Sequence, residues 1–164
     1  MSESLQTVLA TNKPSQLTSP RARLSFLVLS WGFGDSGALG RPKPSEADFI
    51  SRVPEVVEFT ESGSGRVVHP RVTEIACGGY HTLALTDGGD VYSWGDGADG
   101  QLGTGDRTSH FSPVRVESLP KIKAVAAGFC TSAAVGCNGD VYQWGCKEGQ
   151  DGKDPEATEP FLQR

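Results

Sequence analysis

The sequence predicts an all-β fold, a partial β-propeller built from four-stranded antiparallel blades of about 50 residues each. Three observations lead to this prediction. Glycine accounts for 21 of the 164 residues, nearly double its usual share of roughly 7%, which favours turns over helices. The segments 78–95 and 128–145 align without a gap at an offset of 50 residues. Short runs of Val, Ile and Ala alternate with turn residues, which is typical of strands joined by hairpins.

The internal repeat is the strongest of these observations. The two aligned segments share eight identical positions: Gly78/Gly128, Ala84/Ala134, Gly89/Gly139, Asp90/Asp140, Val91/Val141, Tyr92/Tyr142, Trp94/Trp144 and Gly95/Gly145. An earlier copy, "SWGFGDSGALG" at residues 30–40, aligns with residues 93–103 at an offset of 63. Of the 13 residues by which this offset exceeds 50, nine lie between Pro54 and Gly78. We place them around Glu61–Arg66, whose composition is typical of a surface loop.

The predicted strands are short and bounded by turn residues. In chain order they are Leu24–Ser30, Val72–Cys77, Thr82–Thr86, Val91–Trp94 and Lys121–Ala127. In the last copy the dipeptide Asn138-Gly139 predicts a tight hairpin turn, because both central residues can adopt a positive φ.

The repeats divide the chain into three parts. Residues 24–153 are expected to hold two to three blades. Residues 1–23 are rich in Ser and Thr, with Glu3 as their only acid, and are expected to form a disordered tail. An organellar transit peptide is the alternative interpretation of that composition. Residues 154–164 are expected to be a C-terminal tail or the start of a truncated blade, so the chain is expected to be a fragment or a partial propeller.

Composition excludes several classes of function. With 15 basic and 20 acidic residues the net charge is −5, and the basic residues form no stripe, so we expect no nucleic-acid partner. No apolar run approaches the roughly 20 residues that span a bilayer, so we expect no membrane contact. The four cysteines, Cys77, Cys130, Cys137 and Cys146, lack Cys-x-x-Cys spacing. They are expected to be reduced thiols in an intracellular protein of the cytoplasm or nucleus.

The motif "GFGDSG" at residues 32–37 follows an apolar strand and matches the opening of a dinucleotide-binding fingerprint. That fingerprint needs a helix directly after the glycines, because the helix N-terminus holds the pyrophosphate. Pro42 and Pro44 follow instead and prevent a helix from starting. The motif also recurs as "GDGADG" at residues 95–100. We therefore interpret both copies as turns and expect no cofactor.

The acids of the second glycine-rich loop could suggest a calcium site. Asp96, Asp99 and Asp106 do not have EF-hand spacing, since Ala98 stands at the third position and Arg107 at the twelfth. Solvated loop acids are the better interpretation.

His81 and the cysteines could suggest nucleophilic or zinc chemistry. His81 and Cys77 are four residues apart on a strand-like segment, which separates them by roughly 13 Å. The second repeat is expected to place Cys130 where the first has His81. Zinc binding by Cys130, Cys137, Cys146 and a histidine has no supporting spacing. We expect no catalytic residue and no metal site.

Three motifs carry a resemblance to a known family. "WGDGADGQLG" at 94–103, "GGYHTLAL" at 78–85 and "GDVYSWG" at 89–95 resemble the regulator of chromosome condensation repeat family, and recognisable copies cover about residues 24–153. The resemblance implies blades that normally close as a ring of seven, of which about two and a half are present here. It also implies that the histidine matching His81 is largely structural.

Two sets of residues follow from the repeat and the resemblance. The candidate protein-interaction residues, at the start of the second strand of each blade, are Tyr80, His81, Phe129 and Cys130. The structural repeat positions are Trp31, Gly32, Gly34, Gly37, Gly78, Trp94, Gly95, Gly97, Gly100, Gly128, Trp144 and Gly145.

The functional prediction is a non-catalytic protein-interaction or scaffold module. The alternative that the resemblance implies is a guanine-nucleotide exchange factor, or part of one, for a Ran-type small GTPase. The expected partner is a protein, with a small GTPase as one candidate and a second copy of the chain, completing the propeller, as another.

Overall fold

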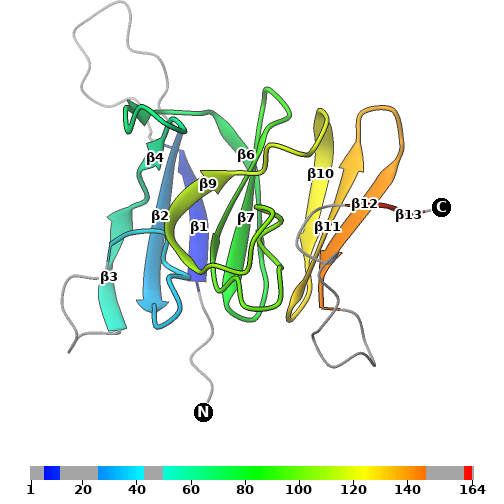
Figure 1. Ribbon diagram of the computed structural model, residues 1–164. Coiled ribbons are helices and arrows are strands. Elements are labelled where there is room, and N and C mark those ends of the chain that lie inside the picture. The colour runs from blue at the N-terminus through cyan, green and yellow to red at the C-terminus, as the bar shows by residue number, and fades with distance from the viewer. Residues whose placement is uncertain (1–5, 12–25, 43–49, 147–160, 164) are drawn as a thin grey trace, which may run out of the picture.

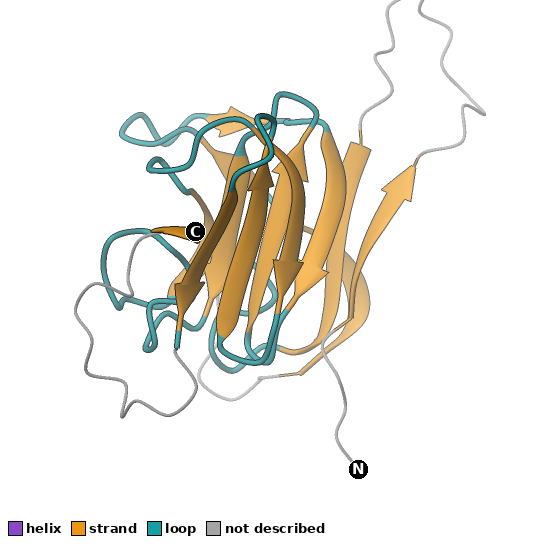
Figure 2. Cartoon of the chain, turned by 90° about the vertical axis from the view of Figure 1, so that its right-hand side faces the viewer, coloured by secondary structure: helices purple, strands orange, loops and turns teal. Residues whose placement is uncertain are grey.

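The computed structural model describes residues 6–11, 26–42, 50–146 and 161–163 (Figure 1). All regular secondary structure in these residues is β, which confirms the predicted fold class. Three antiparallel sheets stand side by side in chain order, and Figure 2 shows their strands running up and down with the loops gathered at the ends. The described ranges contain no helix of the length and apolarity needed to cross a membrane.

The second and third sheets each have four strands in simple sequential order. The second contains β6 (Val72–Cys77), β7 (His81–Thr86), β8 (Val91–Gly95) and β9 (His110–Arg115). The third contains β10 (Ile122–Ala127), β11 (Thr131–Gly136), β12 (Val141–Gly145) and β13 (Phe161–Gln163). Trp94 lies opposite Thr82 in the second sheet and Trp144 opposite Ser132 in the third. The offset of 50 residues that aligns the two repeats in the sequence therefore also relates equivalent strand pairings of the two sheets.

The first sheet and an adjoining hairpin complete the fold. The sheet contains β1 (Gln6–Thr11), β2 (Phe26–Phe33) and β3 (Ile50–Val56) in that order. The hairpin consists of β4 (Phe59–Thr60) and β5 (Val67–Val68), joined by the segment Glu61–Arg66. The predicted surface loop is thus the tip of a hairpin, closed by an Arg66–Glu61 ion pair of 3.1 Å.

Two of the expected chain boundaries are wrong. Within the expected disordered tail 1–23, Gln6–Thr11 forms β1 and pairs along its whole length with β2. Within the expected tail or blade start 154–164, Phe161–Gln163 forms β13, the outermost strand of the third sheet. The physical reason is the same at both ends. Without β1 and β13, the strands β2 and β12 would each have an unpaired edge with unsatisfied backbone donors and acceptors.

The hairpin between β11 and β12 does not use the turn that Asn138-Gly139 suggests. Gly139 N donates to Gly136 O at 2.9 Å, so Cys137 and Asn138 are the central residues, and Gly139 follows them with a φ of +96°. Gly136 N donates to Asp140 O at 2.8 Å and closes the loop. The loop is therefore one residue longer than predicted, with glycine required after the turn rather than inside it.

Each glycine-rich loop receives the tryptophan of the next sheet. Trp94 Nε1 donates to Ala38 O at 3.0 Å, and Trp144 Nε1 donates to Gln101 O at 2.9 Å. Ala38 and Gln101 occupy the same position in their loops at the offset of 63. A Cβ atom on Gly103, whose φ is +69°, would lie 2.8 Å from Trp144 Nε1. Only glycine combines this backbone conformation with so close an indole.

Two apolar clusters fill the spaces between the sheets. The first consists of Val28, Val57, Phe59, Val72, Ala84 and Trp94, and the second of Leu83, Leu85, Val91, Val116, Ile122, Val125, Ala134 and Trp144. Val91 is 1% exposed beneath the third sheet, whereas its repeat partner Val141 is 41% exposed. Within the described residues, the outer face of the third sheet is therefore uncovered.

Candidate protein-interaction site

The aromatic corner, which we define as Tyr80 and Phe129, lies where the second and third sheets meet. Tyr80 is 47% exposed and Phe129 is 72% exposed. Their ring centroids are 5.8 Å apart in an edge-to-face arrangement with an interplanar angle of 77°. Gly79 N donates to Phe129 O at 2.9 Å, and a Cβ atom on Gly79 would touch the Phe129 ring. Two sequential blades thus present one exposed aromatic surface held by a backbone hydrogen bond.

His81 does not belong to this surface, contrary to the sequence-based expectation, because it is fully buried. His81 Nε2 is 2.8 Å from Ser132 Oγ, which itself lies 2.7 Å from Gln101 O and donates to it. Since the hydroxyl proton of Ser132 is used, the imidazole proton is on Nε2 and points at Ser132. A Cβ atom on Gly78 would collide with the His81 ring, so glycine is needed beneath it. His81 is a link between the second and third sheets.

The protonation state of His81 follows from this environment. Burial lowers the pKa of His81 to about 4, and the charge of Asp96 acts in the opposite direction. His81 Nδ1 has no hydrogen-bond partner among the residues that the structure describes, so a proton there would be buried without an acceptor. His81 is therefore a neutral donor near pH 7.

Cys130 does not replace His81 in the repeat. Thr131 lies opposite Gly145 as His81 lies opposite Gly95, so Thr131 is the residue equivalent to His81. Cys130 accordingly takes the position of Tyr80. The gap-free offset of 50 residues gives the same pairing, His81 with Thr131 and Tyr80 with Cys130, so the expectation that placed Cys130 at the position of His81 was wrong by one residue.

Cys130 and Cys146 form a disulfide, so the prediction of reduced thiols is wrong for this pair. Their Cα atoms are 5.6 Å apart, and Cys146 N donates to Cys130 O at 2.9 Å. Tyr80 and Asp96 make the same backbone hydrogen bond in the second sheet, also at 2.9 Å. The hairpin register thus brings the two thiols together beside Phe129. Cys77 and Cys137 are free and exposed.

Removing the disulfide is expected to lower the midpoint of thermal unfolding by roughly 5 °C. The bond closes a loop with a sequence separation of 16, and its loss enlarges the conformational freedom of the unfolded chain. The measurement compares Cys130→Ser/Cys146→Ser with Cys77→Ser/Cys137→Ser by calorimetry. Equal midpoints for the two double variants would contradict the pairing.

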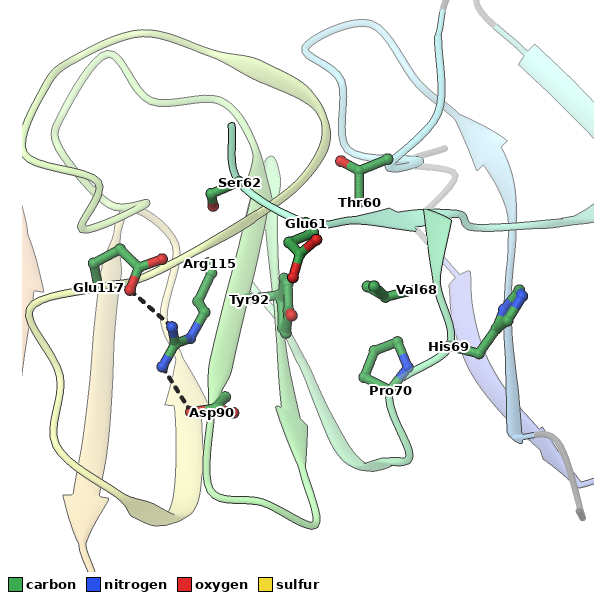
Figure 3. Close-up of a pocket in the computed structure, with 10 residues that line it drawn as sticks. All are labelled: Thr60, Glu61, Ser62, Val68, His69, Pro70, Asp90, Tyr92, Arg115 and Glu117. Atoms are coloured by element: carbon green, nitrogen blue, oxygen red, sulfur yellow. Dashed lines mark hydrogen bonds and ion pairs between the residues drawn. The ribbon is translucent and has the colours of Figure 1, made fainter. Parts of the chain in front are cut away.

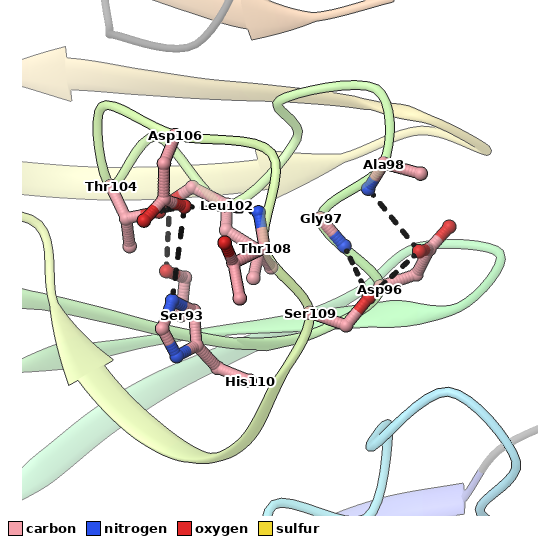
Figure 4. Close-up of polar contacts among 10 residues, drawn as sticks. All are labelled: Ser93, Asp96, Gly97, Ala98, Leu102, Thr104, Asp106, Thr108, Ser109 and His110. Atoms are coloured by element: carbon pink, nitrogen blue, oxygen red, sulfur yellow. Dashed lines mark hydrogen bonds and ion pairs between the residues drawn. The ribbon is translucent and has the colours of Figure 1, made fainter.

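Two of the three acids of the second glycine-rich loop, Asp96 and Asp106, bind that loop's own groups (Figure 4). Asp96 Oδ1 accepts from Ser109 Oγ at 3.1 Å and from Ala98 N at 3.2 Å. Asp106 Oδ1 accepts from Thr108 N at 3.1 Å. In the described part of the chain, no group of three or more His, Cys, Asp or Glu side chains could hold a metal ion. These acids shape the loop that receives Trp144.

Comparison with known proteins identifies the repeat. The model of the regulator of chromosome condensation (RCC1) repeat matches residues 27–85 and 88–135, and a second RCC1 repeat model matches residues 72–101. The chain belongs to the RCC1 repeat family. The resemblance inferred from the three motifs is confirmed.

Curated relatives are similar in sequence to part of this RCC1-repeat chain. It is 38% identical over 92 residues to the E3 ubiquitin-protein ligase HERC2 of Homo sapiens, a match covering 56% of the chain and 2% of HERC2. It is 40% identical over 102 residues to the ultraviolet-B receptor UVR8 of Arabidopsis thaliana, covering 61% of the chain and 21% of UVR8. The match thus covers 2% of the length of HERC2 and 21% of that of UVR8.

Solved structures show the same fold over most of the chain. Prp20p of Saccharomyces cerevisiae matches with a TM-score of 0.68 and 25% identity, covering 84% of this chain and 34% of Prp20p. Human WBSCR16 matches with a TM-score of 0.62 and 28% identity, covering 85% and 37%. The three sheets correspond to about a third of each larger chain, so the partial-propeller prediction is confirmed.

Proposed function

We propose that this RCC1-repeat chain is a non-catalytic protein-interaction module that contacts its partner through the aromatic corner. The observation that carries the proposal is the packing of two exposed rings, Tyr80 and Phe129, from sequential blades. Aromatic side chains held rigidly at a surface contribute a large share of binding energy in protein interfaces. The disulfide at Cys130 holds the backbone next to Phe129.

Solved relatives support a protein as the partner. The structure of Prp20p is described together with its binding to Gsp1p and histones, and yeast RCC1 (Prp20) has been crystallised with Kap60. Gsp1p, histones and Kap60 are partners of Prp20p and are not assigned to this chain by the similarity. For this chain we infer a protein partner, with a Ran-type small GTPase as the first candidate.

The proposal predicts that a photo-crosslinker at position 129 captures a partner. Replacing Phe129 by p-benzoylphenylalanine is expected to give defined crosslinked products in cell extract, identified by mass spectrometry. The same replacement at Val53, which is 60% exposed on β3, is the control and should not give them. The double variant Tyr80→Ser/Phe129→Ser is then expected to bind the captured protein at least roughly 10-fold more weakly. Identical products from both positions, or unchanged affinity, would reject the aromatic corner.

The alternative function is guanine-nucleotide exchange on a Ran-type GTPase, and the structural similarity to Prp20p favours it. We expect no acceleration of nucleotide release by this chain, because it corresponds to 34% of that protein. The measurement follows release of a fluorescent GDP analogue from the GTPase. A rate clearly above the spontaneous one would favour exchange over simple interaction.

Self-association and location complete the proposal. A second copy could cover the outer face that carries Val141, and light scattering would then give a mass that is a multiple of 17.3 kDa. We place the protein in the cytoplasm or nucleus, with an organellar transit peptide in residues 1–23 as the alternative. Microscopy of the chain fused at its C-terminus to a fluorescent protein separates these locations.

A further inference from the structure

The cleft between the β4–β5 hairpin and strands β8 and β9 has a volume of about 500 Å³ (Figure 3). Three carboxylates line it, and each is already paired with a cation of this chain: Glu61 with Arg66, Asp90 with Arg115 and Lys121, and Glu117 with Arg115. The charges of this cleft therefore select no ligand. The cysteines offer a different chemistry, because two of them are joined and two are free.

The disulfide between Cys130 and Cys146 is not needed for the register of its hairpin. Cys146 N donates to Cys130 O at 2.9 Å, and Asp96 N donates to Tyr80 O at the same distance in the second sheet, where no disulfide can form. The strand pairing alone brings the Cα atoms of the two cysteines to 5.6 Å, within the usual range for a disulfide. The same fold therefore accommodates the oxidised and the reduced pair.

The disulfide replaces a set of polar contacts that the second sheet has at this position. Asp96, the counterpart of Cys146, accepts from Ser109 Oγ and from Gln101 Nε2, each at 3.1 Å. These bonds tie the end of β8 to the neighbouring segments. Cys146 has no carboxylate, and its bond to Cys130 ties the end of β12 instead. Reduction would remove this tie.

The other two cysteines indicate that the disulfide is open to exchange. Cys77 and Cys137 are free and exposed. Thiols stay reduced in reducing compartments, where the disulfides that do occur are usually transient and redox-sensing. Cys130 and Cys146 are only partly buried, so a thiolate from solvent can reach their bond. Accessible disulfides are the labile and regulatory ones.

The cysteine pair adjoins the aromatic corner. Phe129 directly precedes Cys130 in the chain, and Phe129 O accepts from Gly79 N at 2.9 Å. The Phe129 ring packs on Tyr80 with centroids 5.8 Å apart. The backbone to which the disulfide is attached therefore also holds one ring of the corner against the other.

We propose that Cys130 and Cys146 form a reversible redox switch that controls how firmly the aromatic corner is held. The proposal rests on the proposed function, because it gives the regulation of the same contact surface. The oxidised pair holds the backbone of Phe129 to the end of β12, and the reduced pair releases it.

The reductant of this switch is a dithiol. One of its thiolates attacks a sulfur of the pair, so that the protein's S–S bond breaks, a mixed disulfide forms and the other cysteine leaves as a thiolate. The second thiolate of the reductant then displaces the remaining protein sulfur. The reductant leaves as a disulfide, having given up two electrons and two protons, which the two cysteines take up. Glutathione disulfide reverses the reaction and leaves as two molecules of reduced glutathione.

The first test asks whether the pair changes state under cellular conditions. The variant Cys77→Ser/Cys137→Ser, which keeps only the pair, is equilibrated in buffers of different ratios of reduced to oxidised glutathione. Its free thiols are then alkylated and counted by mass spectrometry. We expect a transition within the ratios found in cells, with the same midpoint from both directions. A pair that stays oxidised in reduced glutathione alone, or that never oxidises, would overturn the proposal.

The second test follows amide hydrogen exchange of the full chain by NMR in the oxidised and the reduced state. Reduction is expected to speed the exchange of the Cys146 and Gly79 amides at least roughly 10-fold, because their acceptors are Cys130 O and Phe129 O. The matched control is the Asp96 amide, which makes the equivalent hydrogen bond without a disulfide and should change less than about twofold.

Two results of the exchange experiment would reject the switch. Unchanged exchange at Cys146 and Gly79 would mean that the disulfide does not control the corner, and equal acceleration at Asp96 would mean that reduction destabilises the whole chain. Both tests use this chain alone. Their failure would leave the crosslinking test at Phe129 standing, and failure of the crosslinking test would leave the redox transition measurable.

Discussion

Replacing Trp94 by alanine is expected to lower the free energy of unfolding by about 4 kcal/mol. Trp94 is fully buried, belongs to the apolar cluster between the first and second sheets, and packs edge-to-face on Phe59 at 6.0 Å. Its indole also donates to Ala38 O in the first glycine-rich loop at 3.0 Å. The substitution removes the largest side chain of this cluster and leaves a buried carbonyl without its donor. Urea unfolding followed by far-UV circular dichroism measures the loss.

The repeat supplies the matched control. Trp31 occupies the position of Trp94 in the first copy, but it is only partly buried, and no hydrogen bond of its indole occurs within residues 26–42 and 50–146. Trp31→Ala is expected to cost less than half as much as Trp94→Ala. Equal losses of stability would contradict this prediction. They would show that the contact of Trp94 with the loop adds nothing to what a tryptophan at this repeat position contributes by itself.

The sequence predicted the parts of the fold that repeat. The offset of 50 residues aligned the strands of the second and third sheets, and the register of Trp94 and Trp144 confirms it. The strands β1 and β13 were missed because Gln6–Thr11 and Phe161–Gln163 match no repeat copy. Their place in the fold depends on pairing with β2 and β12, a contact made across many intervening residues.

The candidate site was only partly predictable. Tyr80 and Phe129 follow glycines at a blade corner, and the same comparison put His81 with them. The family resemblance implied a structural role for His81, but its burial does not follow from any local pattern, because it depends on Ser132, which is 51 residues away in the chain. The disulfide did leave a signal, since Cys130 and Cys146 each lie eight residues from Asn138, within the turn of the hairpin.

The β4–β5 hairpin had a weaker signal in the sequence. Comparing the repeat copies locates the insertion around Glu61–Arg66, but composition alone described that segment as a loop. Whether an inserted hairpin folds over β8 and β9 or away from them depends on Phe59, which is buried against Tyr92 and Trp94. That contact is tertiary and is not encoded in any local pattern.

Acidification is expected to destabilise the protein through His81. The pKa of His81 is about 4 in the folded state and 6.5 without its environment, and burial is the main cause. Between these values the unfolded chain binds a proton that the folded chain does not, so the free energy of unfolding falls as the pH falls from 6.5 to about 4. The loss attributable to His81 is about 3 kcal/mol and levels off at lower pH.

The variant His81→Gln isolates this contribution. A glutamine amide can still donate to Ser132 Oγ but does not titrate. Carboxylates such as Asp90 contribute equally to the pH dependence of stability in wild type and variant. The stability advantage of the wild type over His81→Gln is therefore expected to shrink by about 3 kcal/mol between pH 7 and pH 4. Parallel pH profiles would contradict a buried neutral His81. If the variant does not fold, NMR titration of the imidazole carbon in wild type decides the question, because protonation of His81 above pH 6 would show that the ring is not held as a neutral donor between the sheets.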